Sequence, residues 1–409
     1  MPQINSFTQD PEVVDAAIRA NSLRDSKRHF SDVIDQEGNQ YVDLVQEGGG
    51  TLGIALVGYL YILEQAGLRP YSLAGTSAGA INTMMIAAYQ KPGKPIAENI
   101  LRIVSEKNLF DLVDGRHRGL IDSFIKGKKL KSFLLLLFTW PWILSDLLKY
   151  KGLNPGTDFI RWITQELQAA EIDSMTDIFN SQERLQSFVT GREEGMEISK
   201  PRMAIIASDV TTHSKAELPA MDHLYWKDAN ANSYHPAEIV RASMSVPLFF
   251  YPYVVDQDIP HAGKERDESW INFAKYFGKV PEKVLFVDGG MLSNFPINIF
   301  HRSDGRTPTR PTFGARLSTW RDATANTSKF FGFLGAMIGT MRQIYDYDFI
   351  LRNPDYKQLI CHIDADKEYN WLDFNLSDED QIGLFRLGAT RAIRFLEDFD
   401  WEKYKSARS

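Results

Sequence analysis

Cysteine is nearly absent from this chain of 409 residues, because Cys361 is its only one. A single thiol excludes an internal disulfide and suits a reducing compartment. The N-terminus lacks the basic and apolar segments of a secretory signal peptide, and no apolar run is long enough to span a bilayer as a helix. We therefore expect a cytoplasmic protein with no Sec signal peptide and no transmembrane helix.

Positive charge is also in short supply, because 46 Lys and Arg stand against 53 Asp and Glu and the formal net charge is −7. Such an acidic chain is a poor partner for a phosphate backbone, so nucleic acid is not an expected ligand. The eight histidines include no His-Glu-x-x-His or other helical ligand pair, which argues against a zinc hydrolase. The acidic run at 364–368 lacks the spacing of a calcium loop. We therefore expect neither a metal nor another cofactor.

Apolar segments of two kinds alternate along the chain and predict an α/β fold. The expected strands lie near residues 41 and 71, at 202–208 and 284–287, and near 312 and 359, with helices near 54, 80 and 237. Strands that alternate with helices usually form a parallel sheet whose two faces are both covered. The pattern therefore predicts a mostly parallel central sheet flanked by helices on both faces.

Residues 75–79, Gly-Thr-Ser-Ala-Gly, place Ser77 between two glycines where an apolar strand turns into a helix. Because Gly75 and Gly79 have no Cβ atoms, the chain can reverse sharply and hold Ser77 in a strained conformation at the helix N-terminus. Backbone amides and the helix dipole then favour negative charge beside the serine oxygen. This elbow predicts Ser77 as a nucleophile.

A glycine-rich loop, Gly48-Gly49-Gly50-Thr51-Leu52-Gly53, precedes the elbow. Successive glycines expose backbone N–H groups at a helix start, where the amides can cradle a phosphate or hold a tetrahedral oxyanion. No Walker lysine follows and the dinucleotide spacing is missing, which disfavours a nucleotide. A purely structural turn needs only one or two glycines. We therefore favour an oxyanion hole built from the amides of Gly48, Gly49 and Gly50, with Gly53 supporting the loop.

An aspartate, Asp288, ends the strand expected at 284–287, and Gly289 and Gly290 follow it. Carboxylates at strand ends are well placed for catalysis, although Asp-Gly-Gly also forms ordinary turns. In combination with the two earlier glycine motifs, Asp288 is a candidate general base.

Together and in this order, the three motifs resemble those of the patatin-like phospholipases, specifically their bacterial branch. Residues 241–250, Arg-Ala-Ser-Met-Ser-Val-Pro-Leu-Phe-Phe, and residues 205–210 are similar to further segments of that family. The resemblance spans roughly 41–296, with a weaker match at 374–377. It implies a lipid acyl hydrolase with a Ser-Asp dyad, in which Ser77 attacks an ester, Asp288 is the base, and the amides of the glycine loop hold the oxyanion.

The resemblance also suggests how the chain is organised. Residues 1–38 would form an N-terminal extension, residues 39–325 a patatin-like catalytic domain, and residues 326–409 a C-terminal segment packed on the same domain. Residues from about 100 to about 197 carry none of the motifs, so we expect a mostly helical insertion there, beside the mouth of the site.

The chain departs from the family pattern at Leu52, where the family usually carries arginine or lysine. Main-chain donors survive such a change. A cation that could fix the loop or attract an anionic head group is missing, however. Hydrolysis of acyl esters is therefore more strongly indicated than a preference for phospholipids.

Other functions stay open on the sequence alone. An α/β-hydrolase would need a triad of Ser77, Asp288 and either His301 or His362, although its elbow is expected later in the chain. An acyltransferase would share the acyl-enzyme and differ only in the acceptor. A non-catalytic lipid-binding module would have no chemical need for a strained serine.

The most unusual composition lies at 133–144, Phe-Leu-Leu-Leu-Leu-Phe-Thr-Trp-Pro-Trp-Ile-Leu, with lysines on both sides. A stretch of about 12 residues with an internal proline is too short to span a bilayer as a helix. The alternatives are a buried helix on the core, an interfacial element that meets lipid, and an oligomer contact. Two tryptophans and the lysines favour a peripheral membrane surface, so Phe133, Trp140 and Trp142 are candidate membrane contacts.

Overall fold

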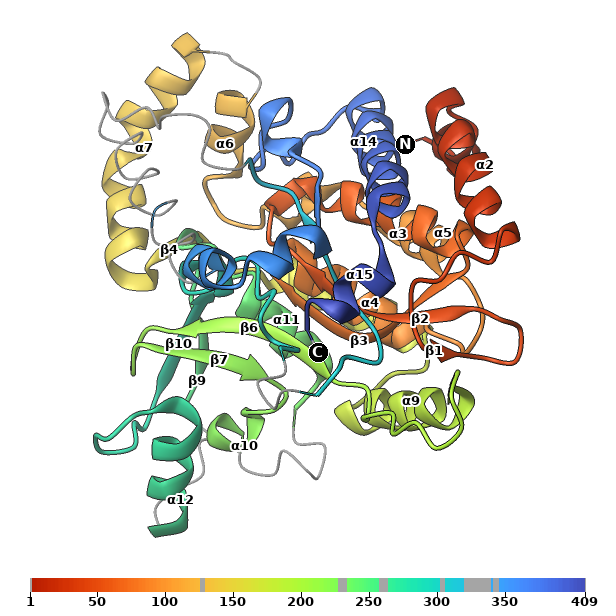
Figure 1. Ribbon diagram of the computed structural model, residues 1–409. Coiled ribbons are helices and arrows are strands. Elements are labelled where there is room, and N and C mark those ends of the chain that lie inside the picture. The colour runs from red at the N-terminus through yellow and green to blue at the C-terminus, as the bar shows by residue number, and fades with distance from the viewer. Residues whose placement is uncertain are drawn as a thin grey trace.

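The structure is a computed structural model that describes residues 2–125, 129–226, 234–256, 264–301, 306–319, 340 and 346–408. One large sheet runs through the middle of the molecule and helices surround it (Figure 1). Every residue of its central strands β2 (Gln40–Gln46), β3 (Leu68–Thr76) and β6 (Met203–Asp209) is buried. Strands buried throughout must be covered on both faces, so the expected layered α/β architecture is confirmed.

Five neighbouring strands of the sheet run parallel, in the order β12 (Ile360–His362), β11 (Thr312–Arg316), β2, β3 and β6. Antiparallel strands complete it: β1 (Val33–Ile34) with β2 and β5 (Thr190–Gly191), β7 (Ser214–Leu218) and β10 (Val284–Asp288) with β6, and β9 (Tyr253–Val255) with β10. The sheet is therefore mostly parallel at its centre, as the sequence predicts, and antiparallel at its margins.

Two strands share one edge of β6, and this arrangement positions the site. Residues 203–206 of β6 pair in parallel with β3, residues 207–209 pair antiparallel with β10, and β7 pairs along the opposite edge. Thr76 lies beside Ile206, and Asp288 lies beside Ala207. The carboxyl ends of β3 and β10 therefore meet head-on, although more than two hundred residues separate them in the sequence.

The two ends of the chain pack on the same helix. The N-terminal α2 (Pro11–Asp25) and the C-terminal α14 (Asp378–Asp398) both contact α3 (Gly53–Gln65), and Figure 1 shows α2 and α14 side by side. A Cβ atom on Gly58 of α3 would clash with the carbonyl oxygen of Phe385, and one on Gly388 would clash with that of Ala55. The two helices approach this closely because both positions are glycine.

The segment between α4 (Ala78–Tyr89) and β6 is mostly helical. It contains α5 (Ala97–Ser105), α6 (Arg118–Ile125), α7 (Lys129–Tyr150), β4 (Gly152–Asn154), α8 (Thr157–Ala169) and α9 (Met175–Phe188). β4 pairs with β8 (Leu248–Phe250), and α7 stands at the side of the molecule in Figure 1. Among the described helices, none is long and apolar enough to cross a membrane.

The remaining helices are short. They are α1 (Ile4–Thr8), α10 (Asp222–Tyr225), α11 (Pro236–Ser243), α12 (Lys264–Ser269) and α15 (Trp401–Ser406). Of these, α11 matters most for function, because it contacts β6, β10 and α4. Its last residues lie where β3 and β10 meet.

Gly388→Ala should destabilise the fold by about 1–3 kcal/mol, because the new methyl group meets a backbone carbonyl that can move only with its helix. Gly119→Ala in α6 is the matched control, since nothing lies within 4 Å of its Cβ position and alanine favours a helix. Urea unfolding of both variants measures the difference. Equal stability of the two would show that α3 and α14 do not need their close approach.

Candidate active site

Ser77 lies at the turn between β3 and α4, with φ of 53° and ψ of −116°. A positive φ is uncommon for a residue with a side chain and indicates local strain. A Cβ atom on Gly75 would clash with the carbonyl oxygen of Gly79, and one on Gly79 would clash with that of Gln46. The elbow therefore depends on two glycines that let three backbone segments touch, as the motif predicts.

The Ser77 backbone is tied to α11. Its N–H donates to the hydroxyl of Ser243 over 2.9 Å, and the residue is only 4 % exposed. Because this amide already has an acceptor, it is not among the donors left for an oxyanion. Ser243 lies in the segment 241–250, but its contact with the elbow could not be read from the sequence.

Asp288 is bound by Ser245, which lies two residues after Ser243 in the same segment. Its N–H donates to the carbonyl oxygen of Ser245 over 2.8 Å, and its Oδ1 accepts from the Gly290 N–H over 2.7 Å. A Cβ atom on Gly289 would lie 3.0 Å from Cγ2 of Thr76 and would clash with the Ile206 carbonyl. The residues next to Ser77 and Asp288 therefore pack against each other.

The glycine loop lies directly against the elbow, since a Cβ atom on Gly48 would be 3.2 Å from Cβ of Ser77. The N–H of Gly48 donates to the carbonyl oxygen of Asn294 over 2.9 Å. The expectation that all three glycine amides are oxyanion donors is therefore wrong for Gly48. Within the described part of the chain, the amides of Gly49 and Gly50 make no hydrogen bond.

A C-terminal segment holds the far side of the loop. The N–H of Thr51 donates to the carbonyl oxygen of Trp371 over 3.0 Å, and the Thr51 hydroxyl lies 3.2 Å from the same oxygen. Gly50 has a positive φ of 56°, and a Cβ atom there would clash with that carbonyl. Trp371 thus fixes the loop from a position more than 300 residues away in sequence.

A buried polar network supports the loop from behind. Glu47 accepts from the Leu317 N–H over 2.6 Å and from Asn294 Nδ2 over 3.1 Å, and Asn294 Nδ2 also lies 2.9 Å from the Gly48 carbonyl. Asp346 accepts from the Ser293 hydroxyl and the Phe295 N–H, both over 2.7 Å. Burial raises the pKa of Asp346 to about 7. The only sequence signal for these residues is that Glu47 and Asn294 adjoin the motifs.

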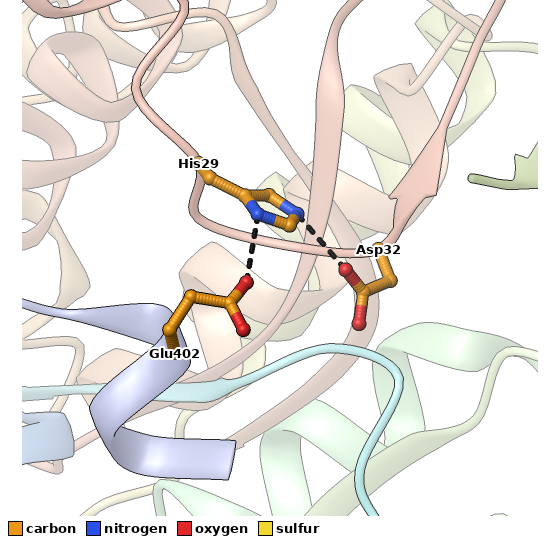
Figure 2. A group of neighbouring side chains, drawn as sticks. All are labelled: His29, Asp32 and Glu402. Atoms are coloured by element: carbon orange, nitrogen blue, oxygen red, sulfur yellow. Dashed lines mark ion pairs between the residues drawn. The ribbon is translucent and has the colours of Figure 1, made fainter. Parts of the chain in front are cut away.

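One group of side chains in the described residues has the composition of a metal site. Figure 2 shows the His29 ring between Asp32 and Glu402, with each ring nitrogen 2.9 Å from a carboxylate oxygen. The ammonium of Lys405 lies 3.1 Å from Asp32 and 3.2 Å from Glu402, so both carboxylates also contact a cationic side chain. The group joins the N-terminal segment to α15.

Comparison with known proteins identifies the family. The family model for patatin-like phospholipase matches residues 44–301, which is more than half of the chain and includes all three motifs. The chain belongs to the patatin-like phospholipase family.

Other members and structures resemble this patatin-like chain to different degrees. The uncharacterized protein YqhO of Bacillus subtilis is 30 % identical over 363 residues, covering 88 % of this chain and all of that protein. The crystal structure of VipD from Legionella pneumophila has a TM-score of 0.41 at 14 % identity, over 90 % of this chain and 70 % of that one. The structure of the ExoU-SpcU complex of Pseudomonas aeruginosa has a TM-score of 0.35 at 13 % identity, over 90 % and 52 %.

Leu52, which departs from the usual patatin-like pattern, belongs to the core. Its side chain is 1 % exposed and lies in the main hydrophobic cluster. An arginine at this position would have to be desolvated or to leave the core, which carries a large cost for an unpaired charge. At this position the chain therefore has an apolar side chain that packs in the core, where the family pattern has a cation.

Neither histidine of the rival triad lies in a position that supports it. His362 ends β12, which lies three strands from β3 and so roughly 14 Å across the sheet. His301 Nδ1 lies 2.8 Å from the hydroxyl of Tyr356, and its ring packs on Phe349. Burial lowers the pKa of both imidazoles. These contacts suit structural histidines.

Stability should respond to the titration of Asp346. Its pKa rises from 3.8 in the unfolded chain to about 7 in the folded one, so the folded state binds the proton more tightly. The stability of the wild type relative to Asp346→Asn should therefore be greatest at low pH and fall as the pH rises from about 4 to about 7.

Unfolding free energies measured across this pH range test the sign of the effect. Asp25→Asn, at an exposed aspartate in α2, is the control and should run parallel to the wild type. Glu64, whose pKa burial also raises to about 7, titrates in every variant and cancels in the comparison. A wild type that gains stability over Asp346→Asn with rising pH would contradict the prediction.

Proposed function

We propose that this chain is a serine acyl hydrolase that cleaves carboxylic ester bonds of phospholipids or related lipids, with Ser77 as nucleophile and Asp288 as general base. The observation that carries the proposal is the head-on meeting of β3 and β10 along β6, at Ile206 and Ala207. One segment, at the end of α11, binds the backbones of both residues. A strained serine and a buried carboxylate at one point of the fold suit nucleophilic catalysis.

In the first half of the proposed reaction, the Ser77 hydroxyl attacks the ester carbonyl carbon while the Asp288 carboxylate takes its proton. The carbonyl oxygen gains negative charge and accepts hydrogen bonds from the amides of Gly49 and Gly50. The tetrahedral intermediate collapses, and the leaving alkoxide takes the proton back from Asp288. The products of this half are an acyl-serine ester and a free alcohol.

In the second half, water attacks the acyl-serine carbonyl and Asp288 accepts a proton from it. Collapse of the second tetrahedral intermediate releases the fatty acid, and Ser77 recovers its proton. A carboxylate with a pKa near 4 is a weak base for a hydroxyl group, so the oxyanion donors must lower much of the barrier. The rigid attachment of the glycine loop to Asn294 and Trp371 supports that role.

We also propose that α7 contacts the membrane surface. Trp140 and Trp142 are 51 % and 56 % exposed and Leu148 is 74 % exposed, whereas Asp146 is buried against His117 at 3.0 Å. An exposed apolar face with tryptophans suits the membrane interface. The third candidate contact, the Phe133 side chain, lies outside the described residues.

The strand that follows α7 provides a connection to the site. β4 pairs in parallel with β8, where Gly152 lies beside Leu248 and Asn154 beside Phe250. β8 begins five residues after Ser243, which binds the Ser77 amide. A membrane contact at α7 would therefore lie on the helix that leads directly into a strand paired with the segment after Ser243.

An acyltransferase is the second candidate, because it would use the same acyl-enzyme with an alcohol in place of water. A triad enzyme would require His301 or His362 to act on Ser77, and a lipid-binding module would require no chemistry at all. These alternatives give different results in one labelling experiment.

A fluorophosphonate probe should label the wild type at Ser77 and leave Ser77→Ala unlabelled. Asp288→Asn should lose labelling and lower ester hydrolysis by about 10³-fold or more, because the base is removed. His301→Ala and His362→Ala should each keep most of the wild-type rate on a phospholipid panel. Equal labelling of all variants, or of none, would contradict the enzyme, and loss with one histidine variant would indicate a triad.

The variant Trp140→Asp/Trp142→Asp should bind liposomes about 10-fold less tightly, because two interfacial side chains are replaced by charges. Phe273→Asp/Phe277→Asp is the matched control, since it adds the same charges at exposed aromatic residues of 53 % and 78 % exposure elsewhere. Co-sedimentation with anionic vesicles measures both. Unchanged binding of the tryptophan variant, or equal loss in the control, would remove the membrane role of α7.

A further inference from the structure

Arg241, in α11, is a buried cation close to both proposed catalytic residues. It is only 4 % exposed and forms no ion pair with a described carboxylate. Burial lowers the pKa of its guanidinium to about 10, while the charge of Asp114 opposes the shift, so the group stays charged at neutral pH. A buried charge without an ion-pair partner costs free energy unless hydrogen bonds satisfy its donors. The hydrogen-bond partners of Arg241 therefore indicate what the charge does.

The guanidinium donates to acceptors in three separate segments. Its Nη2 donates to the carbonyl oxygen of Pro155 over 2.8 Å and to that of Tyr251 over 2.9 Å, and its Nη1 donates to the hydroxyl of Ser245. Pro155 lies between β4 and α8, Tyr251 directly follows β8, and Ser245 lies just after α11. A Cβ atom on Gly156 would lie 2.5 Å from Nε of Arg241, so the turn before α8 leaves room for the guanidinium.

Ser245 connects Arg241 to Asp288. The Ser245 hydroxyl accepts from the guanidinium and donates to the Arg241 carbonyl oxygen over 2.7 Å, which fixes the turn after α11. The Ser245 carbonyl oxygen accepts from the Asp288 N–H over 2.8 Å. Ser243, whose hydroxyl accepts from the Ser77 N–H, lies in the same turn. The turn that Arg241 fixes therefore binds the backbones of both proposed catalytic residues.

Attachment of the helical segment between α4 and β6 does not by itself explain the arginine, because Asn154 of β4 already provides an attachment. Asn154 is fully buried, its Nδ2 donates to the Phe249 carbonyl oxygen over 2.8 Å, and its Oδ1 accepts from the Gly115 N–H over 3.0 Å. These contacts involve no residue of α11. The feature that Arg241 adds is the contact with Ser245.

We propose that Arg241 is a positioning residue for ester hydrolysis, because it holds the turn that places Asp288 relative to Ser77. The inference rests on the proposed function. In this role Arg241 acts through Ser245 and contacts no reacting atom. A displacement of about 1 Å in a reacting group can lower the rate by about 100-fold. Loss of the guanidinium should therefore lower kcat, whereas KM should change little because the substrate contacts remain.

Steady-state hydrolysis of p-nitrophenyl butyrate tests the proposal. Arg241→Met should lower kcat by about 10- to 100-fold and change KM by less than about 2-fold. The rate of fluorophosphonate labelling at Ser77 should fall in parallel. Arg241→Lys, which keeps a cation with N–H donors, should recover part of the loss. Ser245→Ala should also lower kcat, and the Arg241→Met/Ser245→Ala double variant should be no slower than the slower single variant, because both changes break one contact.

Arg69→Met is the matched control. Arg69 is 6 % exposed, forms no ion pair with a described carboxylate, and donates to the carbonyl oxygens of Leu68 and Gly93 over 2.8 Å and 3.2 Å. It lies in β3 eight residues before Ser77, or roughly 26 Å along the strand. Arg69→Met should lose stability in urea unfolding, as Arg241→Met does, but should keep the wild-type kcat.

Asn154→Ala is a second control and should also keep kcat, because it weakens the attachment of β4 without changing α11. Wild-type kcat and labelling rate in Arg241→Met would overturn the positioning role and leave the proposed hydrolase intact. An equal loss in Arg69→Met or Asn154→Ala would overturn it as well. If Arg241→Met does not fold, Ser245→Ala decides, and a wild-type kcat would overturn the role. If the wild type neither hydrolyses the ester nor reacts with the fluorophosphonate, the proposed function fails and the positioning role fails with it.

Discussion

The hydrogen-bonded edge of β6 is the constraint on which the candidate site depends. Each residue of a strand can pair with only one neighbour on a given edge. On one edge of β6, the first residues pair with β3 and the last residues pair with β10. Because β10 runs antiparallel, its carboxyl end points toward the carboxyl end of β3. A parallel β10 would have pointed its carboxyl end away from the carboxyl end of β3. The direction of one marginal strand therefore determines that a serine and a carboxylate meet.

Close backbone packing makes this meeting compact. The space that a Cβ atom would occupy is filled by a carbonyl oxygen from another strand at Gly79 and Gly289, and by the Gly79 carbonyl of the same elbow at Gly75. Gly38 differs, because no atom lies within 4 Å of its Cβ position. Its positive φ of 80° is the reason for glycine there. Strain at Ser77, of the order of 1–3 kcal/mol for such a conformation, is opposed by the Ser243 hydrogen bond. The elbow is thus held by its neighbours as much as by its own sequence.

Local patterns in the sequence predicted the elements and the motif residues. Glycine spacing indicated the elbow at Ser77, and an apolar strand ending in aspartate indicated Asp288, because both signals lie within a few residues. The helices expected near residues 54 and 80 are found at Gly53–Gln65 and Ala78–Tyr89, because apolar periodicity is a local signal. The antiparallel direction of β10 was not predicted, since periodicity carries no information about strand direction.

Partners distant in sequence could not be predicted either. Asn294 binds the Gly48 amide, Ser243 binds the Ser77 amide, and Trp371 binds the Thr51 amide. Each contact joins residues that are more than 150 positions apart. A carbonyl or hydroxyl acceptor is a feature that nearly every residue offers, so no pattern marks which one is used. The burial of Leu52 could not be predicted either, because it depends on core residues that are distant in the sequence.

These distant acceptors determine which amides of the glycine loop keep a free N–H within the described part of the chain. A row of glycines offers equivalent N–H groups, and the sequence cannot rank them. Once Asn294 takes the first and Trp371 takes the one after the third, the two amides between them, Gly49 and Gly50, are left for a ligand. Both acceptors are backbone carbonyls, and Asp346 holds the Asn294 segment by accepting from the Ser293 hydroxyl and the Phe295 N–H. The proposed oxyanion hole therefore consists of the two loop amides that the rest of the fold leaves without an acceptor, and its geometry would depend on the stability of the segments that hold the loop.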